Sequence, residues 1–167
     1  MGLKKGEYWK VGILLVVFTA GVAWAIQIQT PDPRLPILNP SDLNPAVVAD
    51  SMEGIGMNHV VAPFSLVDQV GQTRTEADVE GKIRVVNYFF TTCPSICKDM
   101  AAQMRRVQAA YLENEAIQLM SHSAMPDYDK PEILADYAAA NSVNPNRWWL
   151  LTGDPKELNR LARTSYF

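Results

Sequence analysis

A run of uncharged residues near the N-terminus, residues 11–28, constrains this chain more than any other feature of its sequence. Its 18 positions are mostly apolar and come close to the shortest helix that can cross a lipid bilayer. Trp9 and Trp24 lie near its two ends, and indole rings favour the interface between lipid and water. The run therefore predicts a transmembrane anchor at residues 11–28. A cleaved signal peptide, with Ala23-Trp24-Ala25 as the cleavage site, is the alternative.

Charges on the two sides of the run predict its orientation. Lys4, Lys5 and Lys10 precede it, whereas Arg34 is the basic residue that follows closely. Because lysine and arginine concentrate on the cytoplasmic side, residues 1–10 are predicted to be cytoplasmic, in a single-pass membrane protein whose domain is periplasmic or extracytoplasmic. A cleaved signal would also export the domain. Cys93 and Cys97, the two cysteines of that domain, would then meet an oxidising compartment and need a thiol reductant to stay reduced. The net charge of −3 gives no indication of nucleic-acid binding.

Prolines dominate the next stretch, residues 29–58, at positions 31, 33, 36, 40 and 45. Proline fixes φ and disfavours helix, so the stretch is predicted to be an extended linker between anchor and domain. An ordered segment lying on the domain is the alternative for residues 47–57. The domain itself is expected at residues 59–167, which is long enough for one core.

Apolar periodicity predicts alternating strands and helices within the domain. The expected elements, in chain order, are a hairpin at 60–75, a strand at 83–90, a helix at 98–114, a strand at 117–122, a helix at 131–140, a strand at 148–151 and a helix from Asp154. Four residues of the first helix are expected to face the core: Met100, Met104, Val107 and Tyr111. Strands that alternate with helices predict an α/β domain with a parallel sheet.

Cys93 and Cys97 are the two cysteines of the chain, and they enclose a five-residue motif, Cys93-Pro94-Ser95-Ile96-Cys97, between a predicted strand and a predicted helix. Backbone N–H groups at a helix N-terminus lower the pKa of a nearby thiol. The thiolate is a redox nucleophile and a ligand for soft metals. If both cysteines were helical, their spacing of four would place them on one face.

The rest of the sequence narrows the choice of metal. The residue directly after Cys97 is Lys98 rather than histidine, which argues against covalent haem attachment. A structural zinc site needs four ligands. The chain has 2 cysteines and 2 histidines in all, so such a site would need every one of them, and zinc is not expected. Cu(I) suits thiolates and accepts low coordination numbers. A reversible or structural disulfide without metal is the alternative.

Residues 90–97 resemble the signature of the Sco/SenC proteins, which are membrane-anchored copper chaperones of cytochrome c oxidase assembly. Residues 123–131 are similar to their Ser-Val-Asp-Pro-x-x-Asp-Thr-Pro segment, and Leu151-Thr152-Gly153-Asp154 also matches. The resemblance implies an α/β thioredoxin-like fold with an N-terminal β-hairpin, preceded by one transmembrane helix. It also implies that the domain at 59–167 is incomplete at its C-terminus, with the last strands and helix of the fold missing.

The resemblance implies that Cys93 and Cys97 bind copper and form a redox dithiol, with a histidine expected beyond Phe167 as third ligand. The copper would pass to the dinuclear site in the copper-bearing subunit of cytochrome c oxidase. His59, His122 and Met125 are the candidate substitute ligands, but their places in the sequence are more typical of ordinary core or surface residues.

Two positions depart from the family segment. Met125 and Lys130 stand where the family has aspartate and threonine, and because lysine is a poor helix cap, Asp129 is the expected cap of the next helix. The alternative function is a membrane-tethered thiol–disulfide oxidoreductase, in which Cys93 attacks and Cys97 resolves. A redox or copper sensor that uses the same dithiol stays open, and a thiol peroxidase is a weaker choice.

Overall fold

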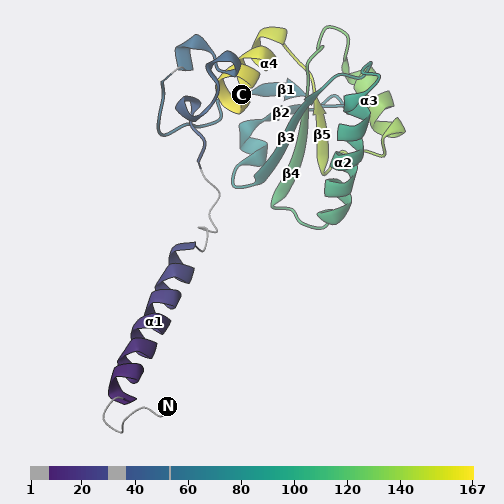
Figure 1. Cartoon of the computed structure of the whole chain (residues 1–167). Coiled ribbons are helices and arrows are strands. Elements are labelled where there is room, and N and C mark those ends of the chain that lie inside the picture. Colours follow the sequence, from purple (N-terminus) through teal and green to yellow (C-terminus); the bar gives the residue numbers. More distant parts are fainter. Residues whose placement is uncertain (1–7, 30–36, 53) are drawn as a thin grey trace. The chain divides into compact units, whose positions relative to one another are not determined.

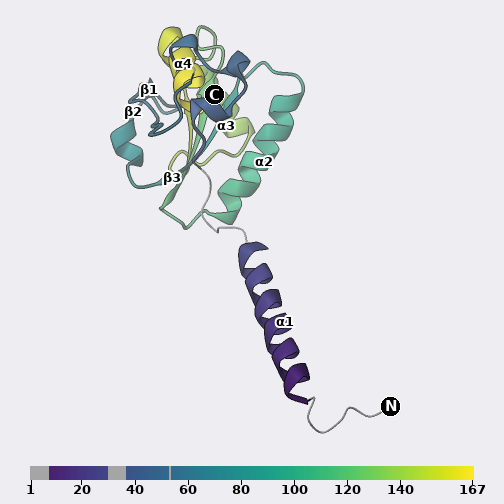
Figure 2. The same cartoon turned by 60° about the vertical axis from the view of Figure 1, so that its left-hand side comes forward.

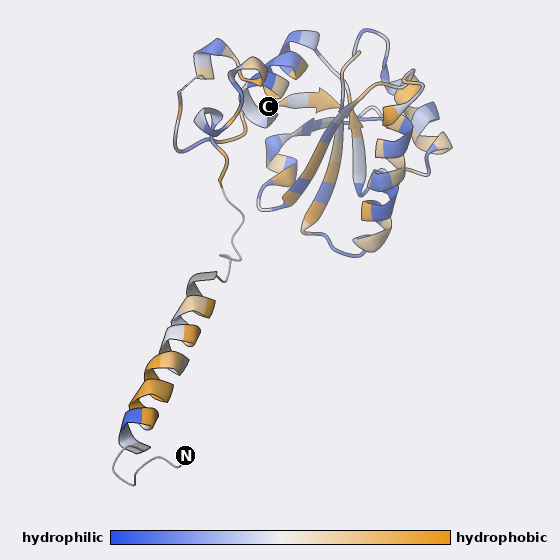
Figure 3. Cartoon of the chain, viewed as in Figure 1, coloured by the Kyte–Doolittle hydropathy of each residue, from blue (hydrophilic) through white to orange (hydrophobic). Residues whose placement is uncertain are grey.

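The computed structural model describes residues 8–29, 37–52 and 54–167, and internal contacts divide the chain into two units, Met1–Ile37 and Leu38–Phe167 (Figure 1). The first unit holds helix α1, Tyr8–Gln29. Within it, 18 residues from Trp9 to Ile26 are apolar enough to cross a membrane, by length and composition alone (Figure 3). The flanking charges Lys4, Lys5 and Arg34 lie outside the described residues, as do the prolines at 31, 33 and 36, so the orientation stays a prediction.

The second unit begins with three short 3₁₀ helices, Pro40–Asp42, Pro45–Val47 and Asp50–Met52. Val48, between the last two, is 2% exposed. The Ala49 N–H donates to the Arg163 carbonyl at 3.2 Å, and the Arg163 guanidinium donates to the Val48 carbonyl at 3.1 Å. This part of the proline-rich stretch therefore packs on the domain. It agrees with the alternative prediction of an ordered segment at residues 47–57 rather than with an extended linker.

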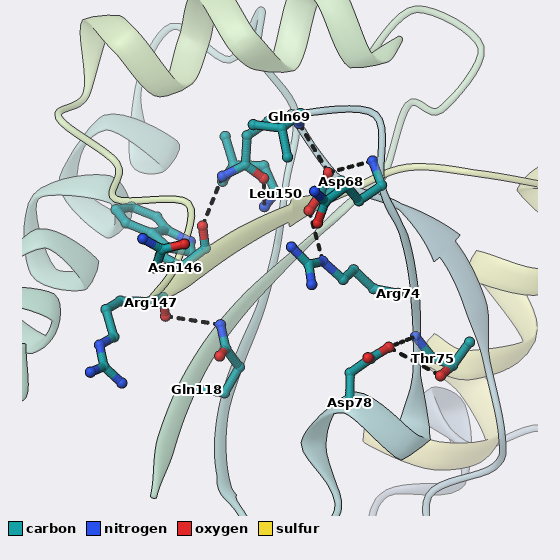
Figure 4. A network of polar contacts seen from close by, with 12 residues as sticks. Asp68, Gln69, Arg74, Thr75, Asp78, Gln118, Asn146, Arg147 and Leu150 are labelled. Atoms are coloured by element: carbon teal, nitrogen blue, oxygen red, sulfur yellow. Dashed lines mark hydrogen bonds and ion pairs between the residues drawn. The ribbon is translucent and has the colours of Figure 1, made fainter. Parts of the chain in front are cut away.

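A two-stranded antiparallel hairpin follows, as predicted, from β1, Ser65–Val67, and β2, Thr73–Thr75. The turn between them is organised by Asp68, whose buried carboxylate accepts hydrogen bonds from the N–H groups of Val70 and Gln72 and from Arg74 Nε at 2.8 Å (Figure 4). Gly71 has a φ of +80°, a conformation that glycine adopts without strain. The two strands have only 3 residues each, so local polar contacts in the turn stabilise the hairpin.

Gln69 attaches this hairpin to the main sheet (Figure 4). Its amide nitrogen donates to the Trp148 carbonyl at 2.9 Å, and its amide oxygen accepts from the Leu150 N–H at 2.8 Å. Beside it, Val67 and Thr152 exchange main-chain hydrogen bonds at 2.8 and 2.9 Å. The hairpin therefore extends the main-chain bonding of the last strand.

The main sheet is parallel, as predicted, with strand order β3-β4-β5. Its strands are β3, Ile83–Phe89; β4, Ile117–Ser123; and β5, Trp148–Leu151. β4 is buried along its whole length, which suits the central strand of a sheet covered on both faces. The strands end at one edge, where Phe89 pairs with Ser123 and the dithiol motif begins.

Helices cover the two faces of the sheet (Figures 1 and 2). α2, Ile96–Ala110, and α3, Pro131–Ala140, pack on one face, in a core cluster that includes Phe89, Leu119 and Leu150. α4, Pro155–Leu161, and the hairpin pack on the other face, in a cluster that includes Met120 and Leu151. Two cores on opposite faces complete an α/β sandwich.

α2 differs from its predicted form. It begins and ends earlier than the predicted 98–114, so Tyr111 lies past its end and is 47% exposed. Met104 and Val107 do pack in the core, as expected, but the buried residues of the helix are Cys97, Ala101 and Met104. The buried face of α2 thus begins at Cys97, a residue that was not among those predicted to face the core.

α4 begins as predicted at Asp154. The Asp154 carboxylate accepts from the Lys156 and Glu157 N–H groups at 2.7 and 3.1 Å, and Pro155 occupies the first turn, where its missing N–H costs nothing. The chain then continues through one wide turn, Ala162–Tyr166, to Phe167.

Candidate metal and redox site

The dithiol motif occupies the loop between β3 and α2. The Cys93 N–H donates to the Phe90 carbonyl at 3.2 Å, which closes a four-residue turn immediately after the strand. α2 begins at Ile96, so Cys97 lies in its first turn and Cys93 precedes the helix. The two cysteines therefore do not share a helix face, and the loop rather than helical spacing brings their thiols together.

Both thiols are free and lie just below the surface. Cys93 is 8% exposed and Cys97 is 6% exposed, and both belong to the core cluster of α2 and α3. Between them the motif exposes Pro94, Ser95 and Ile96, the last at 65%. The two thiols thus pack against the apolar core, and the three residues between them are exposed to solvent.

The two thiols differ in acidity. A hydrogen bond from the Cys97 thiol lowers the pKa of Cys93, and the backbone N–H groups of Ser95 and Cys97 lower it further. Burial raises the pKa of Cys97, and its hydrogen bond to Cys93 adds to that increase. The N–H groups at the start of α2 thus act on Cys93 as the sequence predicted. Cys93 is the thiol that ionises first.

Neither histidine is assembled with the cysteines into a ligand set. In residues 8–29, 37–52 and 54–167, no group of three or more His, Cys, Asp and Glu side chains is placed to hold a metal ion. Adjacent residues of a strand point to opposite faces, and Ser121 accepts a bond from Trp148 in the α2–α3 core. His122 therefore points to the opposite face from the dithiol.

His122 lies instead among aromatic rings. Its ring centroid is 5.2 Å from that of Tyr88, 5.4 Å from that of Tyr166 and 6.3 Å from that of Phe64. Both of its ring nitrogens lack a hydrogen-bond partner, and burial lowers its pKa to about 4. His122 is thus a core residue, one of the ordinary places that the sequence favoured, but without the hydrogen bond expected of such a histidine.

His59 lies at the other end of the domain sequence and contacts its last residues. Its Nε2 is 3.0 Å from the Ser165 carbonyl, and its ring centroid is 4.8 Å from that of Phe167. Met125 is 43% exposed and lines a cavity of about 470 Å³ with Tyr88, Tyr128 and Leu158. Neither cysteine lines that cavity.

Asp129 does not cap α3, so that expectation was wrong. Its fully buried carboxylate accepts from the Thr91 hydroxyl at 2.5 Å, from the Thr91 N–H at 3.3 Å and from the Ser123 hydroxyl at 2.5 Å. The α3 N-terminus has no side-chain cap, and Pro131 in its first turn leaves one fewer N–H to satisfy. Asp129 thus links the dithiol loop to the end of β4.

Tyr137, on α3, is a second residue whose closeness to the dithiol the sequence did not indicate. It packs against the cluster that contains both cysteines. Burial raises its pKa, and the negative charges of Cys97, Cys93 and Asp129 add to the increase. No local pattern could have indicated this, because α3 meets the dithiol only through the tertiary fold.

A parallel α/β sheet reached from an N-terminal hairpin, with a dithiol between a strand and a helix, defines a thioredoxin-like protein. The spacing of the two cysteines separates this chain from the Cys-x-x-Cys members of that class. The SCO1/SenC family model matches residues 52–167, and the chain belongs to the SCO1/SenC family.

Individual relatives agree with this assignment. The SCO1 protein homolog of Bacillus subtilis (strain 168) is 30% identical over 112 residues, which cover 66% of this chain and 58% of that relative. The structure of BsSco, a member of the Sco family of cytochrome c oxidase assembly proteins with a disulfide switch, has a TM-score of 0.59 and 30% identity and covers 66% of each chain. Arabidopsis thaliana ScoI with copper bound has a TM-score of 0.54 and 28% identity, covering 64% of this chain and 66% of that one. The matched part covers between 31% and 58% of the length of the curated relatives.

Proposed function

We propose that this chain is a membrane-anchored copper chaperone that carries Cu(I) on Cys93 and Cys97. Its acceptor would be the dinuclear copper site in the copper-bearing subunit of cytochrome c oxidase. The observation that carries the proposal is the pair of free thiols, buried in one core cluster between β3 and the first turn of α2, of which Cys93 is the more acidic. The family supports it, since relatives include an oxidase assembly protein and a structure with copper bound.

The donor set suits Cu(I) as cargo. Two sulfur atoms are soft ligands, and one of them already ionises more readily than an ordinary thiol. Within the described residues no third ligand joins them. Even with a third ligand, a set of fewer than four would leave Cu(I) open to an incoming thiolate. The histidine expected beyond Phe167 would complete the set by resemblance to the family. An open, low-coordinate site favours transfer by ligand exchange, whereas a closed shell of four ligands would retain the metal.

Redox state would control the cargo. Oxidation of Cys93 and Cys97 to a disulfide removes both thiolates and with them the Cu(I) site. A thiol reductant of the exported compartment would have to restore the pair, because that compartment is oxidising. α1 would hold the domain at the membrane, with residues 1–10 on the cytoplasmic side and 11–28 as the anchor. The proline-rich stretch 29–58 would connect the two, and its part from Leu38 belongs to the domain unit.

The test is anaerobic Cu(I) binding by the reduced full chain in detergent micelles, in competition with a chromophoric Cu(I) chelator. We expect one Cu(I) per chain, lost in Cys93→Ser and in Cys97→Ser. Met125→Leu is the control, because it removes an exposed sulfur near the same edge of the sheet and leaves both cysteines in place. Unchanged stoichiometry in both cysteine variants, with far-UV circular dichroism intact, would refute the proposal.

The difference in acidity between the two thiols favours thiol–disulfide exchange as a second function. The Cys93 thiolate would attack a substrate disulfide and release one substrate thiolate, and Cys97 would then attack the mixed disulfide and release the other. The substrate gains two electrons, and Cys93 and Cys97 end as a disulfide. Turnover with a disulfide peptide and a thiol reductant, in buffer freed of metal, tests this function. Activity that Cys93→Ser abolishes supports it, and no turnover by the folded reduced chain contradicts it.

A further inference from the structure

Asp129 is a buried carboxylate for which copper binding and thiol exchange have no direct use. It is 0% exposed, and its three hydrogen bonds come from two residues of other segments, Thr91 and Ser123. Two of these bonds, from hydroxyl groups, are 2.5 Å long, as charge-assisted bonds are. A buried charge is costly unless it is fully bonded, so these donors hold the carboxylate and are held by it.

Hydrogen bonds alone secure Asp129. The ion pairs among residues 54–167 are Arg74–Asp68 and Arg147–Glu115, and Asp129 takes part in neither. Lys130, its neighbour, directs its ammonium group to the Pro126 carbonyl at 2.9 Å. Geometry at Asp129 is therefore set by Thr91 and Ser123.

Thr91 connects this carboxylate to the dithiol. It is the second residue of the turn that the Cys93 N–H closes on the Phe90 carbonyl at 3.2 Å. Asp129 accepts both the main-chain N–H and the side-chain hydroxyl of Thr91, which fixes the turn at two points. The Ala124 N–H donates to the Phe89 carbonyl at 2.7 Å and extends the sheet pairing to the start of the same loop. The loop thus leaves the sheet along a path that Asp129 determines.

We propose that Asp129 is a positioning residue of the dithiol: through Thr91 it holds the turn that keeps the Cys93 thiol against the Cys97 thiol. The inference rests on the proposed function only in taking Cys93 and Cys97 as the working pair, and it needs no copper. Asp129 touches neither sulfur in this role. Its effect is to raise the effective concentration of one thiol at the other, which preorganises both disulfide closure and a two-sulfur metal site.

The test measures that effective concentration directly. The full chain in detergent micelles is equilibrated with reduced and oxidised glutathione, so that the dithiol and glutathione disulfide give the Cys93–Cys97 disulfide and two glutathione thiols. The oxidised fraction is read after acid quenching and thiol alkylation. We expect Asp129→Ala to lower the effective concentration about tenfold, which corresponds to about 30 mV for this two-electron couple. Thr91→Val, which removes one of the two bonds to Thr91, should move it in the same direction by less.

Two further variants separate positioning from charge and from general destabilisation. Asp129→Asn keeps an acceptor oxygen for Thr91 and removes the charge, so it should stay within about twofold of the unmodified chain. Asp127→Ala removes an exposed carboxylate of the same loop and should have no effect. An unchanged equilibrium in a folded Asp129→Ala chain would overturn the proposal. An equal shift in Asp129→Asn would also overturn it, because charge would then be the cause. Both results are independent of whether the chain binds Cu(I).

Discussion

The aromatic cage around His122 makes the stability of this domain depend on pH. His122 is 0% exposed, both ring nitrogens lack partners, and burial lowers its pKa from 6.5 to about 4. The groups that face it are Phe64, Tyr88 and Tyr166. Burial raises the pKa of both tyrosines, so neither ionises in the acidic range and neither can compensate a charge on His122.

The sign and size of the effect follow from the pKa of His122 in the two states. The unfolded chain binds a proton below pH 6.5, whereas the folded chain resists it until about pH 4. Stability is therefore complete above pH 6.5 and is lost as the pH falls toward 4. A difference of roughly 2.5 pKa units at 1.36 kcal/mol per unit gives a loss of about 3 kcal/mol. That is a large part of the usual stability of a domain of this size.

The assay is urea unfolding of the full chain in detergent micelles, followed by far-UV circular dichroism between pH 7 and pH 4. His122→Phe retains an aromatic ring and removes the titration, so its stability should fall by about 3 kcal/mol less than that of the unmodified chain over this range. Carboxylates also titrate there, but they are shared by both proteins and cancel in the difference. The matched control is His59→Phe, in which the loss assigned to His122 should persist. Parallel loss of stability in the unmodified chain and in His122→Phe would refute the reasoning.

Three substitutions test how the hairpin and α4 are attached, by the same unfolding measurement at pH 7. Gln69→Ala should cost about 2–4 kcal/mol, because it leaves two buried main-chain groups of β5 without partners. The exposed control Gln72→Ala should cost less than about 0.5 kcal/mol. Similar costs for the two variants would contradict the role of Gln69 in attaching the hairpin to β5. Asp154→Ala should cost about 1 kcal/mol through loss of the α4 cap, and Asp154→Ser should restore most of it. Gly153→Ala should cost about 1–3 kcal/mol, because its Cβ would lie 2.8 Å from a methyl group of Leu66, and an unchanged midpoint would show that this contact relaxes freely.

Local patterns in the sequence predicted most of the elements. The apolar run at 83–90, the strand predicted at 117–122 and the aspartate–proline start of α4 each correspond to an element in the structure. These patterns succeed because strand burial and helix capping depend on residues within a few positions of one another. The ends and core face of α2 were predicted less well, because packing against the sheet, rather than periodicity alone, decides which residues of a helix are buried.

Asp129 shows why a polar residue is harder to place. Considered with its sequence neighbours alone, Asp129 is predicted to cap the helix that follows, because aspartate caps helix N-termini well and Lys130 does not. In the folded domain its carboxylate instead bonds Thr91, 38 positions earlier in the chain, because the loops after β3 and β4 meet at the same edge of the sheet. Sequence position alone contains no information on that meeting.

By itself the sequence determined the chemistry and the class of this protein: an apolar N-terminal run, an alternation of strands and helices, and one dithiol where a strand gives way to a helix. Each of these is a property of neighbouring residues. Only the tertiary structure decided that both cysteines are buried, that Cys93 receives the N–H groups at the start of α2, and that His122 faces away from both. Those facts depend on strand register and on packing between distant segments, and the free energy that selects them arises only when the whole core is assembled.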